Sequence, residues 1–271
     1  MIIDFHTHIF PDKIAQSTIS SLEQASNGKA STNGTANGLI EHMKGAGVDI
    51  SVNLPVLTKP SQFESVMKFA MFVNETYANT NEKIISFAGM HPACEDIKGK
   101  MKTLKENGFL GVKIHPDYQG TFIDDDGYIE ILKCAKDLDL IVVTHAGIDD
   151  GYKDMPVRCP PERCAKVIDK VNHNKFVLGH YGAHKQWQKV LEILCEKDVY
   201  FDTAFTFHEI DQDLFKKILD KHGEDKILFA TDCPWRDMKE DLSILKSYNL
   251  SDATMDKILY KNALKLLKIK E

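Results

Sequence analysis

The chain has 271 residues, of which 43% are hydrophobic and 27% charged, and it carries a formal net charge of −6. These values are ordinary for a globular protein, and the acidic balance argues against a nucleic-acid partner. There is no apolar run of membrane-spanning length and no secretory signal, so we expect a cytoplasmic protein with no membrane partner. The six cysteines form no Cys-x-x-Cys pair, and we expect reduced thiols rather than a disulfide or a zinc site.

Short β-rich runs alternate with longer amphipathic runs along the whole chain. We predict strands at residues 1–8, 49–56, 84–90, 111–115, 140–145, 175–180, 199–204 and 226–232. We predict helices at about residues 35–46, 62–78, 96–107, 128–138, 161–171, 184–197, 212–222, 239–247 and 252–267. Residues 10–33 are expected to form a loop, partly helical over 14–25, and residues 116–127 a second loop.

Eight strand–helix units in about 250 residues are typical of a closed (β/α)8 TIM barrel, here with an extra helix at the carboxyl end. The continuous apolar character of the strands indicates a parallel sheet that is buried on both faces. An open, doubly wound sheet is the alternative, but no glycine-rich phosphate loop follows the first strand. We expect residues 1–271 to form a single domain.

The first strand carries the most informative pair of residues. His6 and His8 are two positions apart, so on a strand they share one face and are separated by about 6.7 Å. That spacing allows both imidazoles to bind one metal ion, although two ordinary histidines fit the same pattern. Asp4 has the same spacing from His6, which leaves open whether it supports that imidazole or packs at the bottom of the barrel.

Polar residues recur at the carboxyl ends of the predicted strands, where TIM barrels place their catalytic groups. They are His6, His8, His91, Lys113, His115, His145, His180 and Asp232. Neutral imidazoles with one carboxylate suit zinc or a similar divalent ion, which activates a bound water near neutral pH. Asp232 is then the acceptor of the water's proton, and His180 polarises the carbonyl or transfers a proton.

Four motifs carry a resemblance to a known family. They are DFHTH on the first strand, VVTHAG after the fifth, LGHYGA after the sixth and FATDCPW after the eighth. In their order and spacing they resemble the amidohydrolase superfamily, and within it the amidohydrolase-2 branch that includes aminocarboxymuconate-semialdehyde decarboxylase. The resemblance implies His6, His8, His145 and Asp232 as metal ligands, His180 as the catalytic histidine, and one zinc ion per chain rather than two.

Two features depart from that pattern. Lys113 stands where some superfamily members have a bridging glutamate or a carboxylated lysine; if carboxylated it would bridge two ions, and His180 would bind the second. Unmodified, Lys113 is a cation for a substrate carboxylate or phosphate, and this is the reading we favour. The stretch GMHPACED is similar to the metal-dependent deoxyribonuclease branch, but that branch expects an acidic residue on the fourth strand, which is absent here.

We therefore expect a metal-dependent hydrolase acting on a small, anionic amide, ester or lactone. A decarboxylase of an unsaturated or aromatic acid is the alternative, and a non-catalytic, metal-stabilised binding module is a third reading. Lys113, His115, His91 and Arg158 are the candidate substrate-binding residues, and Phe10 and Trp235 are candidates for the pocket wall. The sequence leaves a homodimer open and does not identify the substrate.

Overall fold

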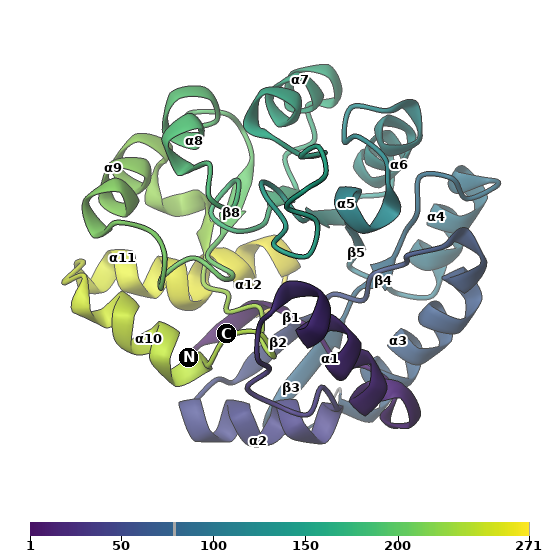
Figure 1. Ribbon diagram of the computed structural model, residues 1–271, viewed down its shortest axis with the longest axis horizontal. Helices are drawn as coiled ribbons and strands as arrows, with labels where there is room; N and C mark the ends of the chain where they lie inside the picture. The colour runs from purple at the N-terminus through teal and green to yellow at the C-terminus, as the bar shows by residue number, and fades with distance from the viewer. Residues whose placement is uncertain (78–79, 271) are drawn as a thin grey trace.

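Nine short parallel strands form the wall of a barrel in the computed structural model, which describes residues 1–77 and 80–270 (Figure 1). The strands are β1 (Ile3–Thr7), β2 (Ile50–Asn53), β3 (Lys83–Ser86), β4 (Ala88–Gly89), β5 (Gly111–Ile114), β6 (Ile141–Thr144), β7 (Phe176–Leu178), β8 (Tyr200–Asp202) and β9 (Ile227–Leu228). β1 to β3 pair in chain order, and β4 to β9 form a second series of pairs.

Two junctions join these two series into one ring. Only Phe87 separates β3 from β4, and its backbone N–H donates to the carbonyl of Asn53 at 2.9 Å, so β3 and β4 act as one interrupted strand. Between β1 and β9, the N–H of Phe5 donates to the carbonyl of Phe229 at 2.9 Å. With β3 and β4 counted once, the described residues form the eight strands of a (β/α)8 barrel. The predicted fold class is confirmed.

Helices surround the barrel on the outside (Figure 1). The longer ones are α1 (Asp12–Ser26), α2 (Ala36–Ala46), α3 (Phe63–Tyr77), α4 (Ile97–Glu106), α6 (Asp126–Asp137), α7 (Pro161–Val171), α8 (Trp187–Ile193), α9 (Gln212–His222) and α10 (Met238–Ser247). Shorter elements are α5 (Pro116–Gln119), α11 (Asp252–Asp256), α12 (Asn262–Leu267) and the turns η1 (Pro60–Gln62), η2 (Glu224–Lys226) and η3 (Lys257–Lys261). The π-helical turn η3 joins α11 to α12, so the extra helix predicted at residues 252–267 is present.

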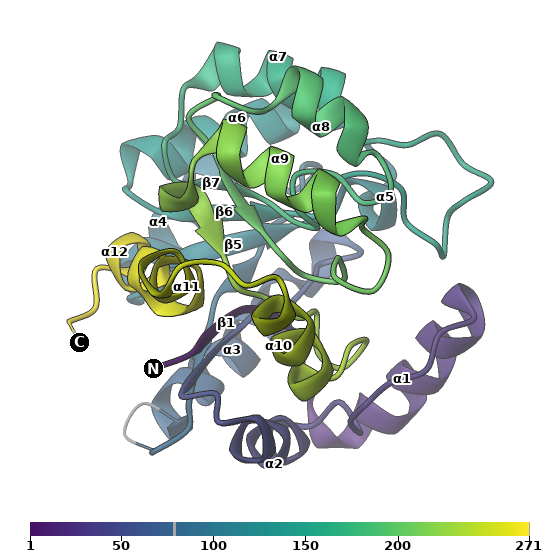
Figure 2. The ribbon, with the colours of Figure 1, turned by 90° about the vertical axis from the view of Figure 1, so that its left-hand side faces the viewer.

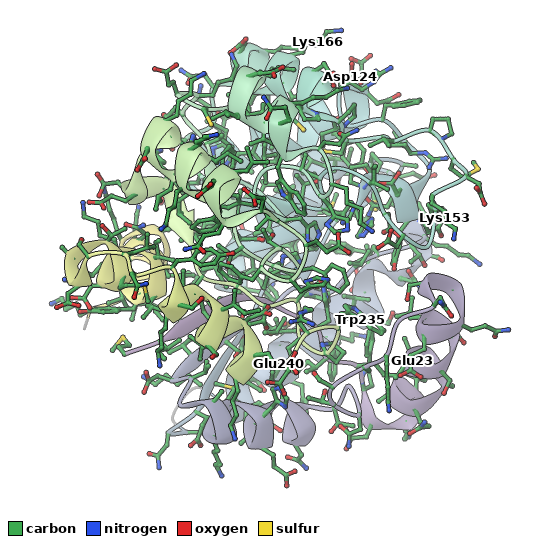
Figure 3. The ribbon with its side chains drawn as sticks, turned by 60° about the vertical axis from the view of Figure 1, so that its left-hand side comes forward. Glu23, Asp124, Lys153, Lys166, Trp235 and Glu240 are labelled. Atoms are coloured by element: carbon green, nitrogen blue, oxygen red, sulfur yellow. The ribbon has the colours of Figure 1, made fainter. Side chains whose placement is uncertain are left out.

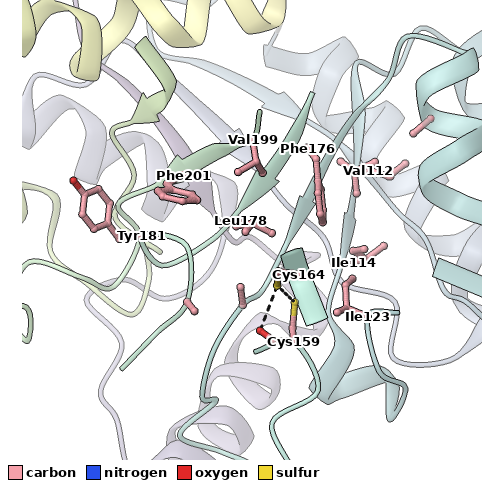
Figure 4. Packing of buried hydrophobic residues seen from close by; sticks show 14 of the residues in the cluster. Val112, Ile114, Ile123, Cys159, Cys164, Phe176, Leu178, Tyr181, Val199 and Phe201 are labelled. Carbon is pink, nitrogen blue, oxygen red and sulfur yellow. Dashed lines mark hydrogen bonds between the residues drawn. The ribbon is translucent and has the colours of Figure 1, made fainter. Parts of the chain in front are cut away.

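The strands are buried on both faces, and each face belongs to a different hydrophobic cluster. On β6, Val142 packs with residues of the surrounding helices, whereas Ile141 and Val143 belong to a cluster of strand residues that includes Leu264 and Leu267 of α12. The first cluster is the layer between barrel and helices, part of which is drawn in Figure 4. The second fills the barrel, and α12 closes it at one end.

Two local predictions differ from the structure, and a third is not tested by it. The helix expected at 184–197 is only α8, because the backbone of His184 pairs with the loop after β6: its N–H donates to Ala146 at 2.8 Å and its carbonyl accepts from Ile148 at 3.1 Å. The loop after β5 contains α5, which begins at Pro116 and ends before Gly120 in a left-handed conformation. Ala78, the predicted end of α3, lies outside the described residues.

The pairing of β1 with β2 shifts register between Asp4 and Thr7, so the two-residue alternation does not continue unbroken to His6. The buried carboxylate of Asp4 accepts the backbone N–H of Thr231 at 3.1 Å and the Thr231 hydroxyl at 2.5 Å. It also accepts the backbone N–H of His6 at 3.2 Å. Asp4 therefore fastens β1 to the segment after β9 and does not contact the His6 imidazole through these bonds.

We expect Asp4→Ala to lower the free energy of unfolding by about 2–4 kcal/mol, because two buried donors of Thr231 lose their acceptor. Urea-induced unfolding followed by circular dichroism measures the change. Asp154→Ala, at an exposed loop carboxylate, is the matched control and should change the free energy by no more than about 0.5 kcal/mol. Similar small effects of both substitutions would contradict the role assigned to Asp4.

Candidate metal centre and active site

The carboxyl ends of the strands open onto a cavity of about 810 Å³. Figure 2 shows α1 and the loop after β6 extending on this side of the barrel, away from the two chain ends. The predicted site residues that line the cavity are His6, His8, Lys113, His115, His145, His180 and Asp232, and Phe10 and Trp235 line it as well. Among the described residues that form this lining, His91 and Arg158 do not appear.

Three of the predicted metal ligands converge at the junction of β1 and β9. His8 Nε2 lies 3.0 Å and His6 Nε2 lies 3.6 Å from Asp232 Oδ1. The three ligand atoms all lie within 4.8 Å of one another. The backbone N–H of Asp232 donates to the carbonyl of His6 at 2.9 Å, so the pairing that closes the barrel also brings these side chains together.

Hydrogen bonds at Nδ1 determine which nitrogen of each imidazole is free. His6 Nδ1 lies 2.9 Å from Asp202 Oδ2, and His8 Nδ1 lies 2.9 Å from the carbonyl oxygen of Leu54. Because a carboxylate and a carbonyl both accept, each Nδ1 carries the proton and each Nε2 presents a lone pair. The His8 lone pair thus faces a carboxylate oxygen of Asp232 at 3.0 Å. A cation held by these acceptors relieves their repulsion, so the residues fit a divalent ion.

The protonation states support this assignment. Burial, assisted by the nearby Lys113, lowers the pKa of His6 well below its usual range. Burial raises the pKa of Asp232, but the positively charged imidazolium forms of His6 and His8 outweigh it and lower that pKa to about 2. At neutral pH the site therefore offers a neutral His6 and an ionised Asp232, which are the forms that bind zinc and similar ions.

Lys113 projects from β5 into the same centre and is buried. Its Nζ lies 2.8 Å from His6 Nε2. Burial lowers the pKa of Lys113 to about 8, although the carboxylates of Asp202 and Asp232 act in the opposite direction. Lys113 is thus a hydrogen-bond donor at the centre of the site. With a pKa of about 8, it is mainly an ammonium at neutral pH and loses its proton slightly above it.

His145 and His180 face each other beside this centre. His180 Nε2 lies 2.8 Å from His145 Nδ1, and His180 Nδ1 lies 3.0 Å from the carbonyl oxygen of Ala204. The Ala204 contact places the proton of His180 on Nδ1, so its Nε2 accepts from His145. Burial lowers the pKa of His180 to about 4, which keeps the ring neutral. The pair is therefore satisfied by one hydrogen bond between neutral rings.

The ring of His145 is oriented toward a second group of residues. Its ligand atoms group with those of His115 and Asp149 rather than with His6, His8 and Asp232. The His115 ring lies between those of His145 and Tyr118, with ring centroids 4.4 Å and 3.9 Å away. Among the described residues, buried His145 Nε2 has no hydrogen-bond partner. The structure thus brings three of the four predicted ligands together and places His145 next to them.

Two supporting carboxylates were not found from the sequence. Asp202, at the end of β8, orients His6 through Oδ2, and its Oδ1 accepts the backbone N–H of His180 at 3.0 Å. Its position at the end of a predicted strand, in YFDTA, was the available signal. Buried Asp117 lies in α5, with its Oδ2 3.9 Å from His145 Nε2. Asp117 had no comparable signal, because it falls in a loop with several other aspartates.

The two remaining predicted substrate residues have other contacts. His91, two residues after the end of β4, is buried, and its Nδ1 accepts the backbone N–H of Ala93 at 3.1 Å in the turn that follows. Arg158 Nη1 lies 3.4 Å from Asp117 Oδ1. Arg158 therefore offsets the negative charge of the buried Asp117 carboxylate, which lies next to His145.

The family model described as amidohydrolase matches residues 3–269. The chain belongs to the amidohydrolase family. The predicted resemblance is confirmed, and this amidohydrolase is a metal-dependent enzyme by family. A search of curated proteins found no significant match. Among the described residues, no helix is both long and apolar enough to cross a membrane.

Solved structures share the fold of this amidohydrolase at low sequence identity. An uncharacterised TIM-barrel protein from Bordetella bronchiseptica is 16% identical with a TM-score of 0.80, and 98% of each chain is covered. A dihydroxybenzoic acid decarboxylase from Polaromonas with bound manganese and the inhibitor 2-nitroresorcinol is 15% identical with a TM-score of 0.69, covering 98% of this chain and 96% of that one. A probable 2-pyrone-4,6-dicarboxylic acid hydrolase from Acinetobacter baumannii with bound citric acid is 16% identical with a TM-score of 0.68, covering 99% of both.

Asp202→Asn is expected to weaken the binding of a divalent ion about 10- to 100-fold, because the carboxylate that orients His6 loses its charge. Titration of the metal-free protein with zinc in competition with a chelating dye measures the dissociation constant. Asp220→Asn, on the exposed side of α9, should leave it unchanged. An unaltered zinc affinity in Asp202→Asn would show that Asp202 does not support the metal ligands.

Proposed function

We propose that this chain is a metal-dependent hydrolase of a small, anionic amide, ester or lactone, with one divalent ion held by His6, His8 and Asp232. The observation that carries the proposal is the His8–Asp232 pair, in which two acceptors face each other at 3.0 Å on the wall of the cavity. Zinc and manganese both fit this set of nitrogen and oxygen donors, and manganese is the ion bound in the similar decarboxylase. The neighbouring His145 is a candidate for a further ligand.

When bound, a divalent ion polarises a substrate carbonyl and lowers the pKa of a coordinated water toward about 7. Asp232 then accepts a proton from the attacking water at its carboxylate, which its pKa of about 2 keeps ionised. His180 Nε2 lies beside the centre, with its Nδ1–H donated to Ala204, and becomes a proton carrier when its bond from His145 is exchanged for one from the substrate. This nitrogen is placed to take up a proton and return it to the leaving group.

The position and charge of Lys113 favour a negatively charged substrate. Its ammonium is buried at the centre and lies close to the groups that would hold the reacting carbonyl. A buried ammonium next to a substrate carboxylate forms a charge-assisted hydrogen bond, which is stronger than a neutral one. Lys113 therefore orients the substrate by its negative group.

Decarboxylation of an aromatic or unsaturated acid is the second candidate. The observation that favours it is the stack of His115 and Tyr118, which lines the same cavity as Lys113 and offers a flat face to an aromatic ring. In this reaction a proton is delivered to carbon, and His180 is the neighbouring group that can carry it. Release of carbon dioxide distinguishes this reaction from hydrolysis.

His180→Gln is expected to lower kcat at least 100-fold, because the proton-transferring nitrogen is lost. The measurement is pH-stat hydrolysis of a panel of small lactones, esters and amides bearing a carboxylate, using zinc-loaded and manganese-loaded protein. His42→Gln, on α2 outside the cavity, is the control and should retain full turnover. Carbon dioxide release from 2,6-dihydroxybenzoate without hydrolysis of any panel member would replace the hydrolase proposal by the decarboxylase.

The number of ions per chain tests the role of Lys113. Wild-type protein is expected to bind one equivalent of zinc, and His8→Ala to bind well below one, in elemental analysis after removal of free metal. Two equivalents, together with a lysine mass raised by one carboxyl group in native mass spectrometry, would instead support a carboxylated Lys113 that bridges two ions. Full metal content in His8→Ala would contradict the ligand assignment.

A further inference from the structure

The cavity has a second region whose lining differs from that of the metal centre. Around His6, His8 and Asp232 the wall is polar, but toward α1 and α3 apolar side chains join it. We call this second region the apolar arm and define it by Phe10, Ile14, Leu22, Val66 and Phe69; the polar side chains of Thr18, Gln62 and Ser65 line the same cavity. The arm and the metal centre belong to one continuous cavity of about 810 Å³.

One wall of the arm is a single face of α1. Ile14, Thr18, Leu22 and Ala25 all line the cavity, and their spacing of four, four and three residues places them on one side of a helix. The residues that α1 buries within the protein are Ala15 and Ile19, and neither lines the cavity. The cavity-facing side of α1 is thus separate from the side that attaches the helix to the barrel.

This face exposes apolar surface that the described part of the chain leaves uncovered. Ile14 is 49% exposed, and Leu22 is only partly buried. Val66 and Phe69 of α3 line the same cavity. Apolar side chains that line an open cavity gain the hydrophobic free energy of burial only when an apolar group fills it.

Figure 3 shows Glu23 on α1, Lys153 above it on the loop after β6, and Trp235 to the left of both. Trp235 lines the cavity together with the metal-centre residues. From Ile14 to Leu22, α1 advances eight residues, which corresponds to about 12 Å of length along the arm.

We propose that the apolar arm binds an extended apolar tail of the substrate while its polar, reacting group lies at the metal centre. This inference rests on the proposed function, because it takes the substrate of that site as the occupant. Because the arm and the metal centre form one continuous cavity, the tail of a substrate bound at the metal centre fits the arm better than a second, unconnected ligand does. The substrate class is therefore a carbonyl compound with an alkyl or aryl tail.

Straight-chain alkyl hydroxamates of two to ten carbons test the inference without turnover, because the hydroxamate head binds a divalent ion and the tail varies. Isothermal titration of zinc-loaded protein should show the dissociation constant falling about two- to fourfold for each added methylene until the arm is filled. The double variant Ile14→Ser/Leu22→Ser should flatten this dependence while leaving the affinity for the two-carbon hydroxamate unchanged. Circular dichroism confirms that α1 is retained.

Phe72→Ser is the matched control, since Phe72 is an exposed aromatic residue of α3 outside the cavity lining, and it should keep the wild-type dependence. No dependence on chain length in the wild type, or the same dependence in the double variant, would overturn the proposal. So would a change of oligomeric state in the double variant by light scattering, which would identify a second copy of the chain as the occupant. Chain-length-dependent binding without any hydrolysis would retain the apolar arm and reject only the hydrolase reaction.

Discussion

The pairing of β1 with the segment after β9 is the interaction on which the rest of the structure depends. It closes the barrel through backbone bonds between Phe5 and Phe229 and between His6 and Asp232. The same bonds place two histidines from the start of the chain against an aspartate more than 220 residues later. The barrel is thus closed and its ligand group assembled by one set of contacts, so a loss of closure is also a loss of the site.

The ligand group is prepared for a cation before any ion binds. Asp202 and the carbonyl of Leu54 hold the Nδ1 protons of His6 and His8, so both Nε2 lone pairs are directed toward Asp232, and that of His6 also toward Lys113 Nζ. Burial keeps His6 neutral, and the low pKa of Asp232, about 2, keeps its carboxylate ionised. Such orientation by neighbouring groups reduces the reorganisation that binding requires.

Membership of the amidohydrolase family defines the kind of centre, but the residues around it decide the reaction. Lys113, His180 and the stacked pair of His115 and Tyr118 stand around the ligand group and differ in what they offer a substrate. The apolar arm at α1 and α3 favours substrates whose non-reacting part is apolar. On this proposal, substrate choice depends on the loops and on α1. The barrel positions these segments, but their sequences can differ without changing the strands.

The barrel and the positions of its strands could be predicted from the sequence, and the resemblance to the amidohydrolase superfamily implied His6, His8, His145 and Asp232 as ligands. Strand periodicity and residue type are local properties, and parallel strands bring all their carboxyl ends to one side. The tertiary structure was needed to show that Asp202 rather than Asp4 orients His6, because a register shift in β1 breaks the alternation that the sequence suggests. It also decided that His145 pairs with His180, and that one face of α1 lines the cavity. These features depend on contacts between segments far apart in the chain, and a sequence pattern can mark a strand end such as that of Asp202 without showing which side chain it contacts.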